Sequence, residues 1–229
     1  MIPGFVDKKL GGKELPTEVF LKKKIAFYKA KQKRLGKNEA KFVEAITISP
    51  SNEMGLFWNT HARISESVAL LHIREWYSTA PVPPIVSPHH SPSASPPPTL
   101  DTPVEFALQA LLLGVVHRTI KSYDTSRGFL NGACERQESI VTSTWIGGIA
   151  NFELAVLELK GAEAFENAYY STNGSATTGS STPTTPASTE SSTNTQSAMA
   201  VMDRWKQAFT VATANLDKAM SLVNAGYEG

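Results

Sequence analysis

Apolar residues recur at every third or fourth position along most of this 229-residue chain, a spacing typical of amphipathic helices. No stretch alternates apolar and polar residues in the way that a half-buried strand requires. The pattern therefore predicts an all-α fold, a helical bundle of about four long helices with a basic N-terminal helical arm and two disordered Pro/Ser/Thr-rich loops.

Capping and breaking residues divide the apolar pattern into segments. Thr17 can cap a helix that ends near Leu35 before Gly36, and Asn38 can cap a short helix. The pattern predicts further long helices from each later start signal. The predicted helices cover residues 17–35, 38–46, 52–77, 102–123, 134–170 and a final C-terminal segment that ends near Gly226.

The strongest start signal is the segment TPVE at residues 102–105. Thr102 is placed as the cap, Pro103 stands at the first helical position, and Glu105 can reach back toward the cap. The apolar run FALQALLLGVV that follows has the length of a buried helix segment.

Two other segments predict where the chain bends. Residues 122–132, SYDTSRGFLNG, are polar and contain glycine, so we expect a turn there. Gly147 and Gly148 inside the next predicted helix indicate a kink or a point of close packing. In the predicted helix 52–77, Phe57, Ile64, Val68 and Leu71 form the apolar stripe.

The last predicted helix has the most regular apolar seam. Its spacing alternates between three and four residues, which keeps one face toward a partner helix. We expect this seam to form one wall of the bundle, with Trp205, Phe209 and Leu216 as anchors; coiling between molecules is the alternative. The seam residues are Met202, Trp205, Phe209, Ala212, Leu216, Ala219 and Val223.

The two loops are predicted at residues 78–101 and 171–197, where Pro, Ser and Thr dominate. Such segments bury too little apolar surface to offset the entropy of ordering. The predicted organisation is a basic helical arm at 1–47 and a helical bundle at 48–229, interrupted by these flexible loops.

Charge is distributed unevenly along the chain. Residues 1–41 carry 12 Lys and Arg against 4 Asp and Glu, a net charge of +8, whereas the whole chain carries only +1. A basic amphipathic helix suits a nucleic-acid backbone, an anionic membrane surface or an acidic protein face; a simple solvated lysine-rich face is the other interpretation. The predicted polyanion-binding residues are Lys22, Lys23, Lys24, Lys29, Lys31, Lys33, Arg34 and Lys37.

No catalytic or cofactor pattern emerges from the remaining polar residues. Cys134 is the single cysteine, so no internal disulfide can form, and we interpret it as a small residue at a helix start. His61 and His72 lie near one face of a predicted helix, but a metal site there would need a further ligand, such as Glu75 or a residue of another helix, so we interpret them as structural or exposed histidines. The glutamates at 153, 158, 163 and 166 fit a polar helix face. We expect no metal, no cofactor and no enzymatic activity.

These observations lead to a functional hypothesis. The chain is expected to be a non-enzymatic structural protein, nucleocapsid- or coat-like, that self-associates as a homo-oligomer and binds single-stranded nucleic acid through the arm. The alternative is a helical adaptor that binds protein partners or anionic membranes through the arm and the proline-rich loop. Without a signal-like or membrane-spanning segment, we expect a soluble intracellular protein.

Overall fold

The computed structural model describes residues 9–10, 13–36, 38–79, 100–174 and 190–225. Within these ranges the all-α prediction is confirmed, since the only strands are the antiparallel two-residue pair β1 (Lys9–Leu10) and β2 (Lys13–Glu14). The helices are α1 (Pro16–Arg34), the 3-10 helix η1 (Glu39–Ala45), α2 (Pro50–Phe57), the 3-10 helix η2 (Thr60–Arg63), α3 (Glu66–Thr79), α4 (Pro103–Thr119), α5 (Tyr123–Glu135), the 3-10 helix η3 (Gln137–Ser139), α6 (Trp145–Gly174) and α7 (Glu190–Ala225).

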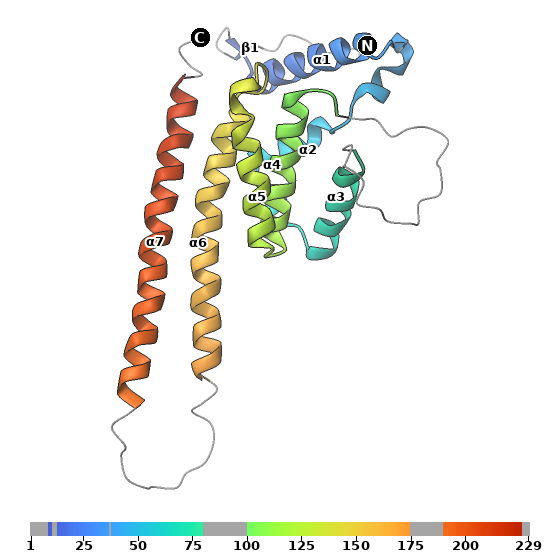
Figure 1. Ribbon diagram of the computed structural model, residues 1–229. Coiled ribbons are helices and arrows are strands. Elements are labelled where there is room, and N and C mark those ends of the chain that lie inside the picture. Colours follow the sequence, from blue (N-terminus) through green and yellow to red (C-terminus); the bar gives the residue numbers. More distant parts are fainter. Residues whose placement is uncertain (1–8, 11–12, 37, 80–99, 175–189, 226–229) are drawn as a thin grey trace.

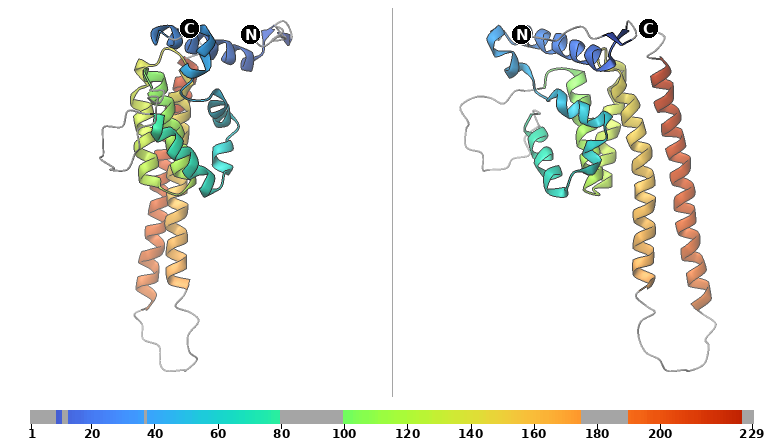
Figure 2. Two further views of the ribbon diagram at one scale, coloured as in Figure 1. Left: turned by 90° about the vertical axis from the view of Figure 1, so that its right-hand side faces the viewer. Right: turned by 180° about the vertical axis from the view of Figure 1, so that it is seen from behind.

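The helices lie in layers (Figures 1 and 2). Helices α4, α5 and α6 pack against one another, α2 and α3 cover one flank, and α1 crosses one end. Helix α7 packs along α6 as the outer arm of a long antiparallel hairpin, and this hairpin extends past the rest of the body. The arrangement therefore leaves one side of α7 without a neighbouring helix among the described residues.

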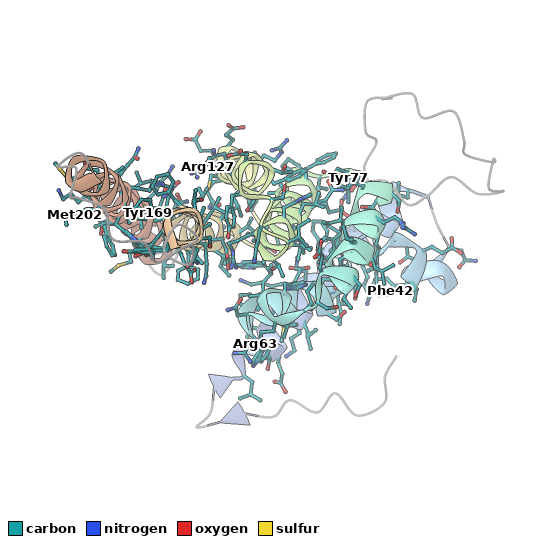
Figure 3. All side chains as sticks on the ribbon, turned by 90° about the horizontal axis from the view of Figure 1, so that it is seen from below. Phe42, Arg63, Tyr77, Arg127, Tyr169 and Met202 are labelled. Atoms are coloured by element: carbon teal, nitrogen blue, oxygen red, sulfur yellow. The ribbon has the colours of Figure 1, made fainter. Side chains whose placement is uncertain are left out.

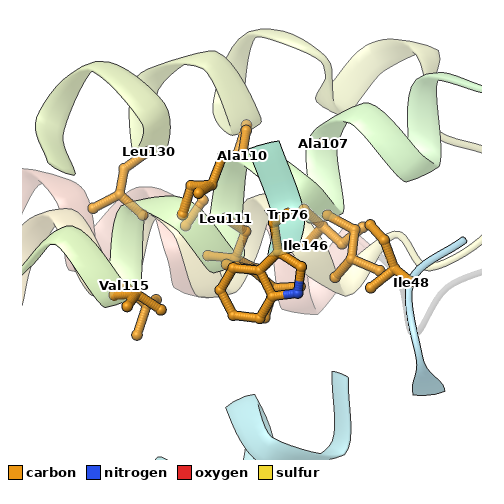
Figure 4. Close-up of a cluster of buried hydrophobic side chains, with 14 of the residues drawn as sticks. Ile48, Trp76, Ala107, Ala110, Leu111, Val115, Leu130 and Ile146 are labelled. Carbon is orange, nitrogen blue, oxygen red and sulfur yellow. The ribbon is translucent and has the colours of Figure 1, made fainter. Parts of the chain in front are cut away.

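Helix α4 forms the centre of the hydrophobic core. All of its side chains from Val104 to Val116 are buried except that of Phe106, which is partly buried, and this agrees with the buried helix that the apolar run predicted. Trp76 of α3 packs against this helix with Ile48 and Ile146, as Figure 4 shows. Burial on all sides explains why α4 has no polar face.

The start signal of α4 is confirmed and also holds α1 in place. The backbone N–H of Glu105 donates to Thr102 Oγ1 at 3.3 Å, and Glu105 Oε2 accepts from the N–H of Asp101 at 3.1 Å. The other carboxylate oxygen of Glu105 accepts from Lys31 Nζ of α1 at 2.5 Å. One carboxylate therefore caps α4 and anchors α1.

Helix α1 has nearly the predicted bounds, but Leu15 rather than Thr17 occupies its cap position. Its inner face carries polar groups that find partners. Lys24 Nζ lies 2.7 Å from Glu53 Oε2 of α2, and Tyr28 donates its hydroxyl to the carbonyl of Ile48 at 2.7 Å. Burial raises the pKa of the Glu53 carboxyl, and the Lys24 ammonium opposes that rise.

The turn predicted at 122–132 is wrong, because these residues lie in α5. Ser126 Oγ donates to the carbonyl of Gly114 at 2.7 Å, and Leu130 is fully buried against α4. A Cβ at Gly114 would lie 2.6 Å from Leu130 Cδ2, so the glycine lets the two helices approach closely. Tertiary packing therefore outweighs the low helix propensity of the glycines in α5.

The break instead falls between α5 and α6. Helix α6 begins at Trp145, eleven positions after the start predicted at Cys134. Ser143 has a φ of 64°, in the left-handed region, which ends any continuous helix at that point.

The predicted long helix over 52–77 is also divided. Asn59 has a φ of 51°, so the chain turns between α2 and η2, and Ser65 Oγ accepts from the N–H of Val68 at the start of α3. The predicted stripe does not form the core face, since Phe57 and Leu71 are exposed. The break rotates α3 so that Trp76 is buried instead.

The predicted loops coincide only in part with the described residues. The stretch 171–197 is helical at both ends, because α6 continues to Gly174 and α7 begins at Glu190. In the stretch 78–101, Thr79 ends α3 and Leu100 is buried. The remainder of both predicted loops lies outside the described residues.

Candidate functional site

Helix α7 buries small residues and leaves its large apolar residues exposed. Alanines occupy most of its buried positions, which lets α6 and α7 pack closely. The buried residues are Val201, Ala208, Ala212 and Ala219, and the exposed large apolar residues are Met199, Met202, Phe209, Leu216, Met220 and Val223. Figure 3 places Met202 on α7 at the outer edge of the molecule, with Tyr169 on the neighbouring α6.

The seam predicted to form a wall of the bundle is therefore only partly buried. Phe209 is 58% exposed and Leu216 is 39% exposed, so neither anchors α7 in the core. Trp205 is half-buried and donates its Nε1–H to Glu166 Oε2 at 2.9 Å. A helix that packs against a single neighbour can bury only one face, and in α7 the alanines occupy it.

An apolar groove lies between the first turns of α6 and the last turns of α7. Its volume is about 440 Å³. No charged side chain lines it, and a Cβ at Gly148 would make only ordinary contact with α7, 3.7 Å from the Ala219 carbonyl oxygen. We call this the hairpin groove; its lining residues are Trp145, Gly148, Ile149, Phe152, Leu216, Ala219, Met220 and Val223.

Aromatic rings continue the hairpin groove toward the N-terminal helices. The ring of Trp145 lies 4.9 Å from that of Phe57 in α2, and Phe57 lies 5.9 Å from Phe20 in α1. The start of α6 and the end of α7 both lie at the end of the molecule that α1 crosses, as Figure 1 shows. The apolar surface is therefore built from three separate parts of the chain, an arrangement that the sequence pattern alone does not indicate.

The predicted polyanion-binding residues do not form one surface. Lys24 and Lys31 are buried, and each faces a glutamate of another element, so they cannot reach an external polyanion without leaving a carboxylate unpaired. Arg34 pairs with Asp101 at 3.0 Å. Lys22, Lys23, Lys29 and Lys33 are exposed along α1, and Lys37 lies outside the described residues.

The glutamates predicted to form a polar face of α6 have different environments. Glu153 and Glu158 are buried. Arg118 Nη2 donates to Glu153 at 2.6 Å, and Glu158 accepts from Arg127 of α5 and lies 3.4 Å from Arg204 of α7. Burial raises the pKa of Glu153, and Arg118 opposes that rise. These pairs join α6 to its neighbours.

The cysteine and histidines lie in packed surroundings. Burial raises the pKa of the Cys134 thiol, which disfavours the nucleophilic thiolate. The rings of His61 and His72 are 6.0 Å apart, and His72 stacks on Trp76. In the part of the chain that the structure describes, no three His, Cys, Asp or Glu side chains are placed to hold a metal ion.

Comparison with known proteins identifies the family. Residues 1–120, which run from the N-terminus through α4, match the model of the Iml2/Tetratricopeptide repeat protein 39 family. The chain belongs to this family. The hairpin groove lies beyond the matched residues.

Curated relatives agree with the family match. The chain is 27% identical over 156 residues to the inclusion body clearance protein iml2 of Aspergillus terreus, 26% over 158 residues to that of Aspergillus niger, and 24% over 154 residues to that of Aspergillus clavatus. Each comparison covers 65% of this chain but only 19% or 20% of the relative. The chain thus spans about a fifth of the length of these relatives. No solved structure matches it significantly.

The family membership corrects the functional hypothesis. The prediction of a nucleocapsid- or coat-like structural protein is wrong, because a tetratricopeptide repeat family has a helical protein-interaction fold. The adaptor alternative fits the family better, and neither self-assembly nor nucleic-acid binding finds support. Among the described helices, none has the length and apolar character needed to cross a membrane.

Proposed function

We propose that this chain is a non-enzymatic helical adaptor that binds an amphipathic helix of a partner protein in the hairpin groove. The observation that carries the proposal is the groove of about 440 Å³ between α6 and α7, which no charged side chain lines. In the described part of the chain, α6 is the only helix that packs extensively against α7. Exposed apolar grooves of this kind mark interaction sites on soluble domains.

The spacing of the exposed residues favours a helix as the occupant. Phe209, Leu216 and Val223 recur every seven residues along the exposed side of α7, and Leu216 and Val223 line the groove. A seven-residue apolar repeat matches the contact face of a partner helix that lies along it. A partner helix with its own apolar stripe would cover this side of α7 and insert a large side chain between Phe152 and Met220.

The names of the relatives connect this binding activity to a process. Those proteins are named for inclusion body clearance, and we propose that this chain contributes to the same process by bringing a partner to aggregated protein. Binding of this kind requires no reacting group. The exposed lysines of α1 supply a second contact, for an acidic face of a partner, and the division into residues 1–47 and 48–229 stays a prediction.

Photo-crosslinking tests the groove directly. A photoreactive phenylalanine analogue is placed at Met220 in the groove and, as a matched control, at Val141, which is 91% exposed and lies outside it. We expect a discrete protein crosslink from position 220 that disappears when Phe152→Asp is added, because a buried unpaired carboxylate is costly. Equal crosslinking from both positions, or a crosslink that survives Phe152→Asp, would contradict the proposal that a partner protein binds in the hairpin groove.

The clearance role needs a separate measurement. Cells that carry a fluorescent aggregating reporter are followed while they express the wild-type chain, Met220→Asp or Val141→Asp. We expect inclusions to disappear faster with the wild type and Val141→Asp than with Met220→Asp. If crosslinking succeeds but inclusion lifetimes do not differ, the chain is an adaptor for another process.

A further inference from the structure

A second cavity lies away from the hairpin groove, where α4 ends and α5 begins. Its volume is about 450 Å³, within the range of sites for small molecules. The α4–α5 turn lies at the end of the body opposite α1, whereas the start of α6 and the end of α7, which line the hairpin groove, lie at the same end as α1 (Figure 1). The two sites are therefore separate.

Positive charge dominates the lining of this cavity. Arg118 of α4, Lys121 of the following turn and Lys160 of α6 all line it, and Glu163 is its one carboxylate. Lys160 pairs with Glu163 at 2.6 Å. Lys121 has no ion pair within the described part of the chain, and its φ of 61° holds the turn in a left-handed conformation.

Arg118 is held in a fixed position at the wall of the cavity. Its side chain is 9% exposed, and Nη2 donates to Glu153 at 2.6 Å. Its Nε is buried and does not face the cavity, but Nη1 is not buried and forms no hydrogen bond within the described residues, so the guanidinium retains one usable donor group. A fixed guanidinium with free donors suits an oxyanion, which accepts two parallel hydrogen bonds from such a group.

The N-terminus of α5 adds a further favourable feature. Ser122 occupies the cap position, but its side chain makes no cap hydrogen bond and donates instead to Thr125 Oγ1 at 3.0 Å. The first-turn N–H groups of a helix without a side-chain cap attract anions. Asp124, in this turn, is exposed and does not line the cavity.

We propose that this cavity binds a small organic phosphate monoester. Arg118 and Lys160 are each paired with a glutamate, so Lys121 leaves the site with a net positive charge, and the three terminal oxygens of a phosphate can accept hydrogen bonds from Arg118 and Lys121 together. Tyr123, Ala62 and Ala164 form the less polar part of the wall, where an organic group attached to the phosphate can lie. The phosphate oxygens accept hydrogen bonds from Arg118 and Lys121, and Asn167, which also lines the cavity, can contact a hydroxyl of the ligand.

Titration calorimetry with phenyl phosphate, inorganic phosphate and phenylacetate tests the site on the full chain. We expect phenyl phosphate to bind most tightly, because it offers both the dianion and a ring that can contact Tyr123. Phenylacetate presents the same ring on a monoanion. If inorganic phosphate binds as tightly as phenyl phosphate, the cavity does not recognise the organic group of the ligand. If phenylacetate binds more tightly than phenyl phosphate, the cavity does not prefer a phosphate, and the proposal is wrong.

Three variants separate the site from general surface charge. Lys121→Gln should weaken phenyl phosphate binding by at least about tenfold through loss of one charge-assisted hydrogen bond. Glu163→Gln should strengthen binding by removing the one negative charge of the lining. Lys206→Gln on exposed α7, outside the cavity, should leave the affinity unchanged. Equal effects of Lys121→Gln and Lys206→Gln, or no binding by the folded wild type, would overturn the proposal.

Discussion

Adjacent glycines in α6 have different neighbours. A Cβ at Gly148 would find only ordinary contacts, 3.7 Å from the Ala219 carbonyl oxygen and from Val223 Cγ2. A Cβ at Gly147 would collide with Gln137 Oε1 and lie 2.6 Å from its Cδ. Gln137 also accepts the N–H of Gly147 at 2.9 Å and donates to the Thr144 carbonyl at 3.0 Å. Gln137 thus fixes the start of α6 through two hydrogen bonds.

Alanine substitutions at the two glycines should therefore act in opposite directions. Gly148→Ala should raise the free energy of unfolding by about 0.5 to 1 kcal/mol, because alanine is the better helix former. Gly147→Ala should lower it by roughly 1 kcal/mol, because displaced Gln137 loses its two hydrogen bonds. Urea unfolding measures both. An equal gain from both variants would show that Gln137 does not hold this helix start.

His61 makes stability depend on pH. Burial first, and the neighbouring His72 second, lower the pKa of His61 below its ordinary value of 6.5. The folded protein therefore resists protonation of this ring, and the unfolded chain takes up the proton more readily. The stability that neutral His61 contributes is present above about pH 6.5 and is lost as the pH falls from there through the folded-state pKa.

The histidine contribution is measured by difference. The free energy of unfolding of the wild type should fall more steeply below pH 6.5 than that of His61→Phe, because the variant has no proton to bind at this position. Other buried groups titrate in both proteins and cancel in the comparison. If the free energies of unfolding of the two proteins changed with pH in parallel, the conclusion that His61 is buried in its neutral form would be wrong.

Among the elements, α7 shows how one amphipathic helix can have two apolar faces. Its inner face is narrow and made mainly of alanine, and its outer face carries the larger side chains. Small residues allow close helix approach, so the inner face packs well without large groups. The outer face is therefore available for binding rather than needed for folding.

Truncations along the hairpin should reflect this difference. Met202→Ala should change the free energy of unfolding by no more than about 0.5 kcal/mol, because Met202 is exposed. Leu157→Ala should lower it by about 2 to 5 kcal/mol, since Leu157 of α6 is fully buried. Thermal and urea unfolding compare the two. A large loss in Met202→Ala would place the outer face of α7 in a contact that the monomer lacks, such as a second copy.

At the scale of the whole molecule, contacts decrease from the core to the end of the hairpin. Helix α4 is buried on all sides, whereas the distal part of α6 has only α7 beside it in the described part of the chain. Most side chains of residues 165–172 are exposed. Local opening should therefore require least free energy at this end.

Hydrogen exchange followed by mass spectrometry checks that gradient. Amides of α4 should exchange most slowly, with protection near the global free energy of unfolding, and amides of residues 168–174 should exchange fastest among the helices. The first half of α6, which packs on α5, should lie between them. Uniform protection along α6 would show that the hairpin opens as one unit with the core.

The amino-acid sequence by itself determined the helical class, the bounds of α1, the start signal of α4 and its burial. These features depend on local capping groups and on apolar periodicity, which act within a few residues of the chain. The sequence pattern also showed that α7 has an apolar seam.

The tertiary structure alone decided which surfaces became interior. Periodicity shows that a helix has an apolar face, but the face that is covered depends on the neighbouring helix, and α6 covers the alanines of α7. Likewise, Lys31 is 1% exposed because Glu105, distant in sequence, supplies its counter-charge. Residues 123–135 form helix α5 despite their glycines, because this helix packs against α4. Each of these outcomes depends on contacts between residues far apart in the chain, so local sequence patterns do not contain them.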